Sequence, residues 1–331
     1  MELIFHIGMG KTGTSSIQQA LKADKENLEA QGAAYLGMWL DMLDPEFKQH
    51  GGFNTFFSAT PDAMVFYADK FVEHALGVAS QTGCQKLIFS NEALFDHEEP
   101  LAHFFTRLRE HADLKIVAYL RNPYDWLPSA FTQWGLRHKT TPGVVPPYQQ
   151  RARSLIRRYE SVRLWERDFG DILDVRLFDK SIDVVEDFSG MLDLSVTPLP
   201  KRALEREESV EVLLRGLYNS RYQQPISPER FNGFVLNAAR NRPQSVSASF
   251  AEWFDWSDTT EVVAEHRDLF EHVSDKYGFD FVTPPTQSNS VELDEEFRDR
   301  LVDYLLAITF EQADRLKRLE LQVKALNPDE D

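Results

Sequence analysis

Residues 8–16 combine the groups that bind a phosphate or sulfate. The segment reads Gly8-Met9-Gly10-Lys11-Thr12-Gly13-Thr14-Ser15-Ser16. Glycines let backbone N–H groups approach an anion closely, and a helix that starts near Thr14 adds the positive end of its dipole. Lys11 adds a full positive charge, and three successive hydroxyl groups add hydrogen-bond donors. We therefore expect an anionic group to bind at this turn.

The triphosphate-binding loop Gly-x-x-x-x-Gly-Lys-[Ser/Thr] fits this segment in neither register. Gly10-Lys11-Thr12 supplies the end of that motif, but Phe5 stands where its first glycine should be. Counting from Gly8 places Gly13 correctly, but Thr14 then replaces the lysine. The segment is therefore not the phosphate loop of a nucleotide triphosphatase.

A second polar constellation follows the apolar run 115–120. Residues 119–131 read Tyr-Leu-Arg-Asn-Pro-Tyr-Asp-Trp-Leu-Pro-Ser-Ala-Phe. Asn122 can cap a helix that has Pro123 at its first position, which puts Arg121 at the end of a strand and Ser129 two turns into the helix. Pro128 removes a backbone hydrogen bond, so we expect the helix to bend or to start late. In open parallel sheets the ligand binds at such strand ends.

The two segments resemble the binding motifs of sulfotransferases that use 3′-phosphoadenosine 5′-phosphosulfate (PAPS). Lys-Thr-Gly-Thr-Ser after a strand resembles their 5′-phosphosulfate loop, and Arg-Asn-Pro-x-Asp-x-x-x-Ser-x-Phe resembles their 3′-phosphate motif. The resemblance extends more loosely over residues 1–190. It implies that PAPS, and the product PAP, contact Gly10, Lys11, Thr12, Gly13, Thr14, Ser15, Ser16, Arg121 and Ser129. It also implies in-line transfer of a sulfuryl group to an acceptor hydroxyl, with Lys11 stabilising the leaving phosphate.

Glu92 is the candidate base. It follows the apolar run Lys86–Ser90, so we expect it at the same sheet edge as Lys11 and Arg121. A base must come within about 3 Å of the acceptor hydroxyl. Glycan-modifying members of the resembled family use a glutamate, which favours a glycan acceptor here. The alternatives are that Glu92 pairs with Lys11 or caps the next helix.

Two histidines compete for a place in the site. His6 lies inside the first apolar run, which indicates a hydrogen-bonded core residue. His50 lies where bacterial relatives carry a histidine, and it is a candidate for contact with the acceptor. We expect no metal, because lysine, N–H groups and hydroxyls can stabilise the transfer of a sulfuryl group, which carries less charge than a terminal phosphoryl group.

Positive charge concentrates in residues 137–167 although the chain is acidic overall. The basic residues are Arg137, His138, Lys139, Arg151, Arg153, Arg157, Arg158, Arg163 and Arg167. One interpretation is a solvated helix face. The other is a rim that attracts PAPS or an anionic glycan.

Alternating apolar runs and helical periods predict an α/β layered fold with a central, mostly parallel sheet. The resemblance to sulfotransferases implies that this is a P-loop-like three-layer fold. The runs 2–7, 86–90, 115–120 and 172–178 read as buried strands. After about residue 195 the pattern is helical, and residues 292–326 predict one long helix or two. We expect a single domain over 1–331, with a nucleotide-binding core in 1–190 and a mainly helical extension in 191–331.

A three-and-four spacing of apolar residues recurs near the end of the chain, at Leu316, Leu319, Val323 and Leu326. These residues either pack onto the chain's own core or form the seam of a homodimer.

Composition limits the remaining function classes. The 331 residues carry a net charge of −17, which argues against broad binding to nucleic acid or to an anionic membrane surface. Cys84 is the only cysteine, so no internal disulfide or multi-cysteine metal site is expected. The chain lacks a signal-like start and a transmembrane run, and we expect a cytoplasmic protein.

Two rival functions remain. One is a P-loop kinase that uses ATP and Mg²⁺ on a small molecule; Phe5 and the second motif count against it. The other is a non-catalytic nucleotide-binding module, which needs no base. Glu92 discriminates between this module and an enzyme.

Overall fold

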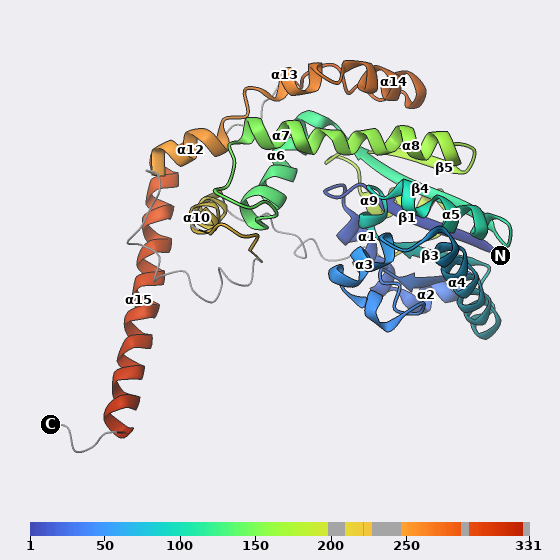
Figure 1. Ribbon diagram of the computed structural model, residues 1–331, viewed down its shortest axis with the longest axis horizontal. Coiled ribbons are helices and arrows are strands. Elements are labelled where there is room, and N and C mark those ends of the chain that lie inside the picture. The colour runs from blue at the N-terminus through green and yellow to red at the C-terminus, as the bar shows by residue number, and fades with distance from the viewer. Residues whose placement is uncertain (198–208, 221, 227–245, 286–290, 327–331) are drawn as a thin grey trace. The chain divides into compact units, whose positions relative to one another are not determined.

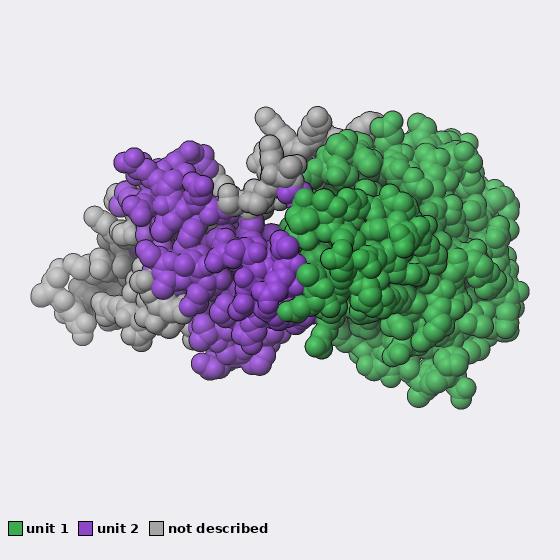
Figure 2. Space-filling view, turned by 90° about the horizontal axis from the view of Figure 1, so that it is seen from above, with its two compact units in different colours: residues 1–126, 156–205, 263–284 green, residues 127–155, 206–262, 285–331 purple. Residues whose placement is uncertain are grey.

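The computed structural model describes residues 1–197, 209–220, 222–226, 246–285 and 291–326. The chain divides into two compact units that alternate along the sequence (Figure 2). Unit 1 comprises residues 1–126, 156–205 and 263–284, and unit 2 comprises residues 127–155, 206–262 and 285–331. The expected single domain, with its core ending near residue 190, stays a prediction.

Unit 1 is built on a five-stranded sheet with the order β2-β3-β1-β4-β5 (Figure 1). All neighbouring strands are parallel. The strands are β1 (Glu2–Gly8), β2 (Ala33–Gly37), β3 (Lys86–Ser90), β4 (Asp113–Arg121) and β5 (Leu173–Phe178). Four of them were predicted from their apolar runs and are confirmed; the short β2 was not.

Helices cover both faces of this sheet. On one face Ile4 belongs to a buried cluster with Ile17 of α1 and Phe188 of α9. On the other face the Phe5 ring lies 5.1 Å from Phe71 of α4 and 4.9 Å from Phe105 of α5. The helices of unit 1 are α1 (Thr14–Ala23), α2 (Lys25–Ala30), α3 (His50–Phe57), α4 (Pro61–Thr82), α5 (Glu98–Arg109), α8 (Glu160–Phe169), α9 (Val184–Met191) and α14 (Arg267–Tyr277), with the 3₁₀ turns η1 (Pro45–Lys48), η2 (Glu92–Leu94) and η4 (Ile156–Tyr159). The helices on both faces of the parallel sheet form three layers, and the predicted P-loop-like three-layer α/β fold is confirmed. Burial on both faces explains why the strands are apolar almost throughout.

Helix α14 comes late in the sequence but belongs to unit 1. The ring of Phe270 lies 5.1 Å from the ring of Tyr159. The carboxylate of Glu166 on α8 accepts hydrogen bonds from His272 Nε2 and from the hydroxyl of Tyr277, both at 2.5 Å. Apolar packing and these bonds to a largely buried carboxylate together fix α14 on α8.

The described residues of unit 2 are mainly helical. Its elements are the end of α6 (Pro123–Phe131), the π-helical segment η3 (Thr132–Arg137), α7 (Tyr148–Leu155), α10 (Ser209–Asn219), α12 (Val246–Phe254), most of α13 (Thr259–Ala264) and α15 (Glu295–Leu326). Helix α15 is a single helix, which settles the prediction of one helix or two. Pro128 lies inside α6, which nevertheless starts at Pro123 and gives way to π-helix after Phe131.

Contacts within unit 2 are made by buried side chains. The hydroxyls of Tyr148 and Thr259 lie 2.7 Å apart. A Cβ at Gly216 would lie 2.8 Å from the Trp253 ring, so α10 requires glycine there. In the described ranges, no helix has the length and apolar character needed to cross a membrane.

Candidate functional site

The backbone of the loop between β1 and α1 depends on two residues of the sequence motif, Gly13 and Thr12. Gly13 has a positive φ of 84°, and a Cβ added to it would lie 2.7 Å from Val184 Cγ1. The Thr12 hydroxyl donates to the backbone carbonyl of Met9 and closes the loop. Only glycine tolerates this backbone and this contact together. The conformation therefore depends on the Gly13 and Thr12 of the sequence motif.

The start of α1 presents backbone donors. The first of the helix's own hydrogen bonds runs from the Ser16 N–H to the Gly13 carbonyl at 2.9 Å. The N–H groups of Thr14 and Ser15 precede that bond, and such first-turn groups bind anions. This matches the predicted helix start at Thr14.

The hydroxyls of the loop differ in their surroundings. Thr14 is 3% exposed, and its Oγ1 has no hydrogen-bond partner among the described residues. Ser15 is exposed and Ser16 is half-buried. A buried hydroxyl without a partner costs about 1–3 kcal/mol. A ligand oxygen that accepted a hydrogen bond from Thr14 would offset this cost.

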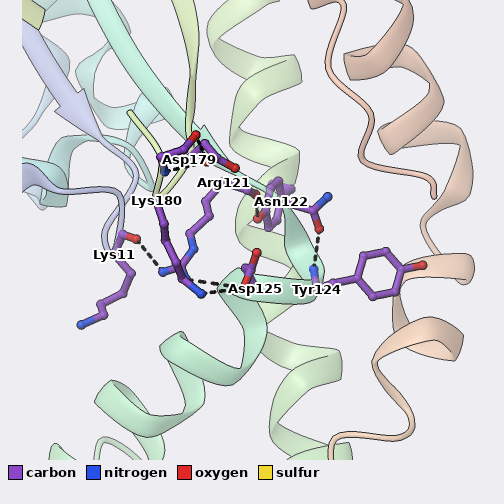
Figure 3. Close-up of polar contacts among 9 residues, drawn as sticks. Lys11, Arg121, Asn122, Tyr124, Asp125, Asp179 and Lys180 are labelled. Atoms are coloured by element: carbon purple, nitrogen blue, oxygen red, sulfur yellow. Dashed lines mark hydrogen bonds and ion pairs between the residues drawn. The ribbon is translucent and has the colours of Figure 1, made fainter. Parts of the chain in front are cut away.

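Arg121 ends β4 and reaches the loop (Figure 3). Its guanidinium donates to the backbone carbonyl of Lys11 at 3.4 Å and lies 3.9 Å from the Asp125 carboxylate. It also lies 5.6 Å from the centre of the Phe178 ring. The indole N–H of Trp126 donates to the Gly10 carbonyl at 2.8 Å. The structure therefore joins the two sequence motifs through these two side-chain hydrogen bonds and through the backbone bond from the Met9 N–H to the Tyr119 carbonyl at 2.9 Å.

The turn after β4 is formed as predicted. The Asn122 side chain accepts from the N–H of Tyr124 at 3.0 Å and so caps α6. Ser129 lies on α6 after residue 126 and therefore in unit 2. Its expected contact with the 3′-phosphate stays a prediction.

Sequence reasoning missed one cation beside Arg121. Lys180 Nζ lies 3.1 Å from Asp125 Oδ1, and Figure 3 shows both side chains near the Arg121 guanidinium. Lys180 follows the last residue of β5 by two positions. The rule that places ligand groups at strand ends would have identified it.

Glu92 is the first residue of η2, directly after β3. A Cβ at Gly8 would lie 2.7 Å from Glu92 Cβ, so Glu92 packs against the end of β1. The side-chain amide of Gln18 donates to Glu92 Oε2 at 3.2 Å. Capping of η2 is done by Asn91, whose Oδ1 accepts from the Ala93 N–H at 2.8 Å. Glu92 thus reaches the predicted sheet edge without being the cap.

The two histidines have different settings. His6 is fully buried, its Nδ1 lies 2.8 Å from Ser90 Oγ, and burial lowers its pKa to about 3, so its imidazole is neutral. This is the core role that was expected. His50 begins α3, and its side chain lies outside the described part of the structure.

Several residues of the basic stretch contact acidic side chains of their own unit. In unit 1, Arg158 lies 3.4 Å from Asp96, Arg163 lies 3.1 Å from Asp268, and Arg167 lies 3.3 Å from Glu98; in unit 2, Arg153 lies 3.2 Å from Glu261. Such pairs fit the solvated-face interpretation better than a rim reserved for an anion.

No three histidine, cysteine, aspartate or glutamate side chains of the described residues are grouped in a way that could hold a metal ion.

No protein-family model matches the sequence, and no curated protein matches it. The fold is similar to that of a sulfotransferase from Alicyclobacillus acidocaldarius, with 17% identity, coverage of 66% of this chain and 95% of the other, and a TM-score of 0.34. It is also similar to the sulfotransferase domain from the curacin biosynthetic pathway, with 9% identity, coverage of 80% and 96%, and a TM-score of 0.36. Both of these structures are sulfotransferases.

Proposed function

We propose that the protein is a sulfotransferase that moves a sulfuryl group from PAPS to an acceptor hydroxyl and releases PAP. The observation that carries the proposal is the buried hydroxyl of Thr14 at the start of α1, which has no hydrogen-bond partner in the part of the chain that the structure describes. It lies in the loop that resembles a 5′-phosphosulfate site. Arg121, the residue proposed for the 3′-phosphate, is hydrogen-bonded to that same loop at Lys11.

In the proposed reaction the acceptor oxygen attacks sulfur while Glu92 takes the hydroxyl proton. The bond between sulfur and the bridging oxygen breaks, and the negative charge passes to the 5′-phosphate of PAP. Lys11 and the first N–H groups of α1 stabilise that charge without a metal ion. Arg121 binds the 3′-phosphate through its planar fork, with Ser129 as its second partner.

We further propose that the acceptor is a glycan hydroxyl, because Glu92 matches the glutamate of glycan-modifying sulfotransferases. The exposed Val302, Leu306 and Leu319 on α15 support a homodimer contact through that helix. The side chains of the other three predicted seam residues lie outside the described part.

The kinase alternative requires a glycine at position 5. Phe5 is instead 1% exposed in the middle of β1 and packs among four other phenylalanine rings. Only the five residues 9–13 separate the end of β1 from the start of α1. A residue buried inside a strand cannot belong to a phosphate loop, so no observation favours the kinase.

Calorimetric titration with PAP, with and without a chelator, tests the proposal. PAP should bind with the same affinity in both cases, and it should bind more tightly than adenosine 5′-phosphosulfate, which lacks the 3′-phosphate contacted by Arg121. A preference for ATP with Mg²⁺ over PAP would overturn the proposal in favour of a kinase.

A further inference from the structure

Gln18 makes two hydrogen bonds that link α1 to the end of β3. Its side chain is 8% exposed. The amide nitrogen donates to the Ser90 carbonyl at 3.0 Å and to Glu92 Oε2 at 3.2 Å. A primary amide carries two N–H donors, and both are used here. Gln18 follows Thr14 by four residues, so both lie on the same side of α1.

The groups around Glu92 are fixed by other contacts. Ser90 pairs with His6 in the register of β1 and β3, and its Oγ lies 2.8 Å from His6 Nδ1. Asn91 donates to the Met38 carbonyl at 2.6 Å while it caps η2. The backbone before Glu92 is therefore held on two sides. The Glu92 carboxylate accepts a side-chain hydrogen bond from Gln18 alone among the described residues.

We infer that Gln18 is the positioning residue of the proposed base. Its amide holds Oε2 of Glu92, which leaves Oε1 to receive the proton of the acceptor. Because Gln18 is neutral, it orients the carboxylate without neutralising it. The same helix begins at the anion-binding loop, so α1 fixes the base relative to the sulfuryl group. This inference rests on the proposed function.

The contact predicts a specific effect on the base. Gln18→Met keeps the length and burial of the side chain but removes both donors, so Oε2 of Glu92 loses the hydrogen bond that holds it. Gln18→Glu has almost the same shape but replaces the donor with a second carboxylate beside the first. It should displace the Glu92 carboxylate more strongly than Gln18→Met does.

Gln31→Met is a matched control. The Gln31 amide nitrogen likewise donates two hydrogen bonds, to the backbone carbonyls of Asn27 at 3.1 Å and Ser195 at 2.8 Å, but it touches no carboxylate. The Gln31 side-chain oxygen accepts from the Ser195 N–H at 2.7 Å. Both substitutions remove two donors from a glutamine of unit 1. Only the Gln18 change should act on Glu92.

Two measurements test the inference: the rate of PAP release from PAPS with water as the acceptor, and the Kd of PAP. In Gln18→Met, PAP release should fall about tenfold while the Kd stays within about twofold. A loss confined to the rate separates positioning of the base from general damage to the binding loop. Gln31→Met should change neither quantity.

The outcomes separate the inference from the function. If wild-type protein releases PAP and Gln18→Met matches its rate, the inference alone is overturned. If Gln18→Met loses its fold, Gln18→Glu decides, and an unchanged rate of PAP release in that variant also overturns the inference. A wild-type protein that binds no PAP overturns the proposed function, and the inference with it.

Discussion

Thr14→Val should change stability and ligand affinity in opposite senses. Valine has the shape of threonine, so the start of α1 is kept. In the free protein the Thr14 hydroxyl is buried without a partner among the described residues, and the substitution removes that cost. The free energy of unfolding should therefore rise by about 1–2 kcal/mol. A rise of this size corresponds to roughly 2–4 °C in Tm for each kcal/mol.

The ligand complex should respond in the other direction. If Thr14 Oγ1 donates to an anionic oxygen of PAP, Thr14→Val removes one charge-assisted hydrogen bond. Such bonds contribute about 1.5–3 kcal/mol, so the Kd of PAP should rise roughly 10- to 150-fold. Thermal unfolding with and without PAP, followed by calorimetric titration, measures both changes on one preparation.

Thr12→Val is the matched control, because Thr12 is equally buried but its hydroxyl already donates to the Met9 carbonyl. That variant should lose stability, by about 1–3 kcal/mol, since the Met9 carbonyl is left without its donor. The reasoning is refuted if Thr14→Val destabilises the free protein as Thr12→Val does, or if it leaves PAP affinity unchanged.

Three further changes test other parts of the site. Glu92→Gln should lower turnover of PAPS by roughly 10²–10⁴ while PAP affinity stays within a few-fold, and unchanged turnover would remove Glu92 as the base. Gly13→Ala should lower both stability and PAP affinity, because the added Cβ would lie 2.7 Å from Val184. Gly32 has a similar positive φ but nothing within 4 Å of an added Cβ, so Gly32→Ala should lower stability alone. Equal losses of PAP affinity in the two variants would contradict the role of Gly13 in the binding loop. Burial and, after it, the neighbouring Asp168 raise the pKa of Glu98 to about 7. The contribution of Glu98 to the free energy of unfolding is therefore fully present at low pH and is lost as the pH rises from about 4.5 through 7. Glu98→Gln should make the free energy of unfolding less dependent on pH over that range, and an unchanged slope would refute the assignment.

The strands that carry the two motifs could be predicted because their apolar runs are nearly continuous. β1, β3, β4 and β5 are covered on both faces or lie beside such strands, and burial on both faces leaves little room for polar residues. β3 is as short as β2 and was predicted, but β2 was not, because two of its five residues are alanine and it lacks a run of large apolar side chains. Alanine favours helix, so the local signal for a strand was weak.

Gln18 could not have been found from the sequence. A polar residue between apolar positions of an amphipathic helix reads as part of its solvated side. Its two partners lie 72 and 74 residues away, and only the parallel pairing of β1 with β3 brings them to α1. Lys180 differs, because the end of β5 was predicted and the strand-end rule was not applied to it.

The packing of α14 on unit 1 bears on how the protein can be cut. A fragment that ends near residue 190 would carry both sequence motifs and all five strands of the sheet in unit 1. It would also expose the Tyr159 ring where Phe270 now covers it, and it would leave Glu166 without His272 and Tyr277. The Tyr159 hydroxyl donates to the Arg121 carbonyl, so the damage would extend to the end of β4. A shortened version for biochemistry must therefore keep residues 263–284, joined by a linker in place of the intervening chain.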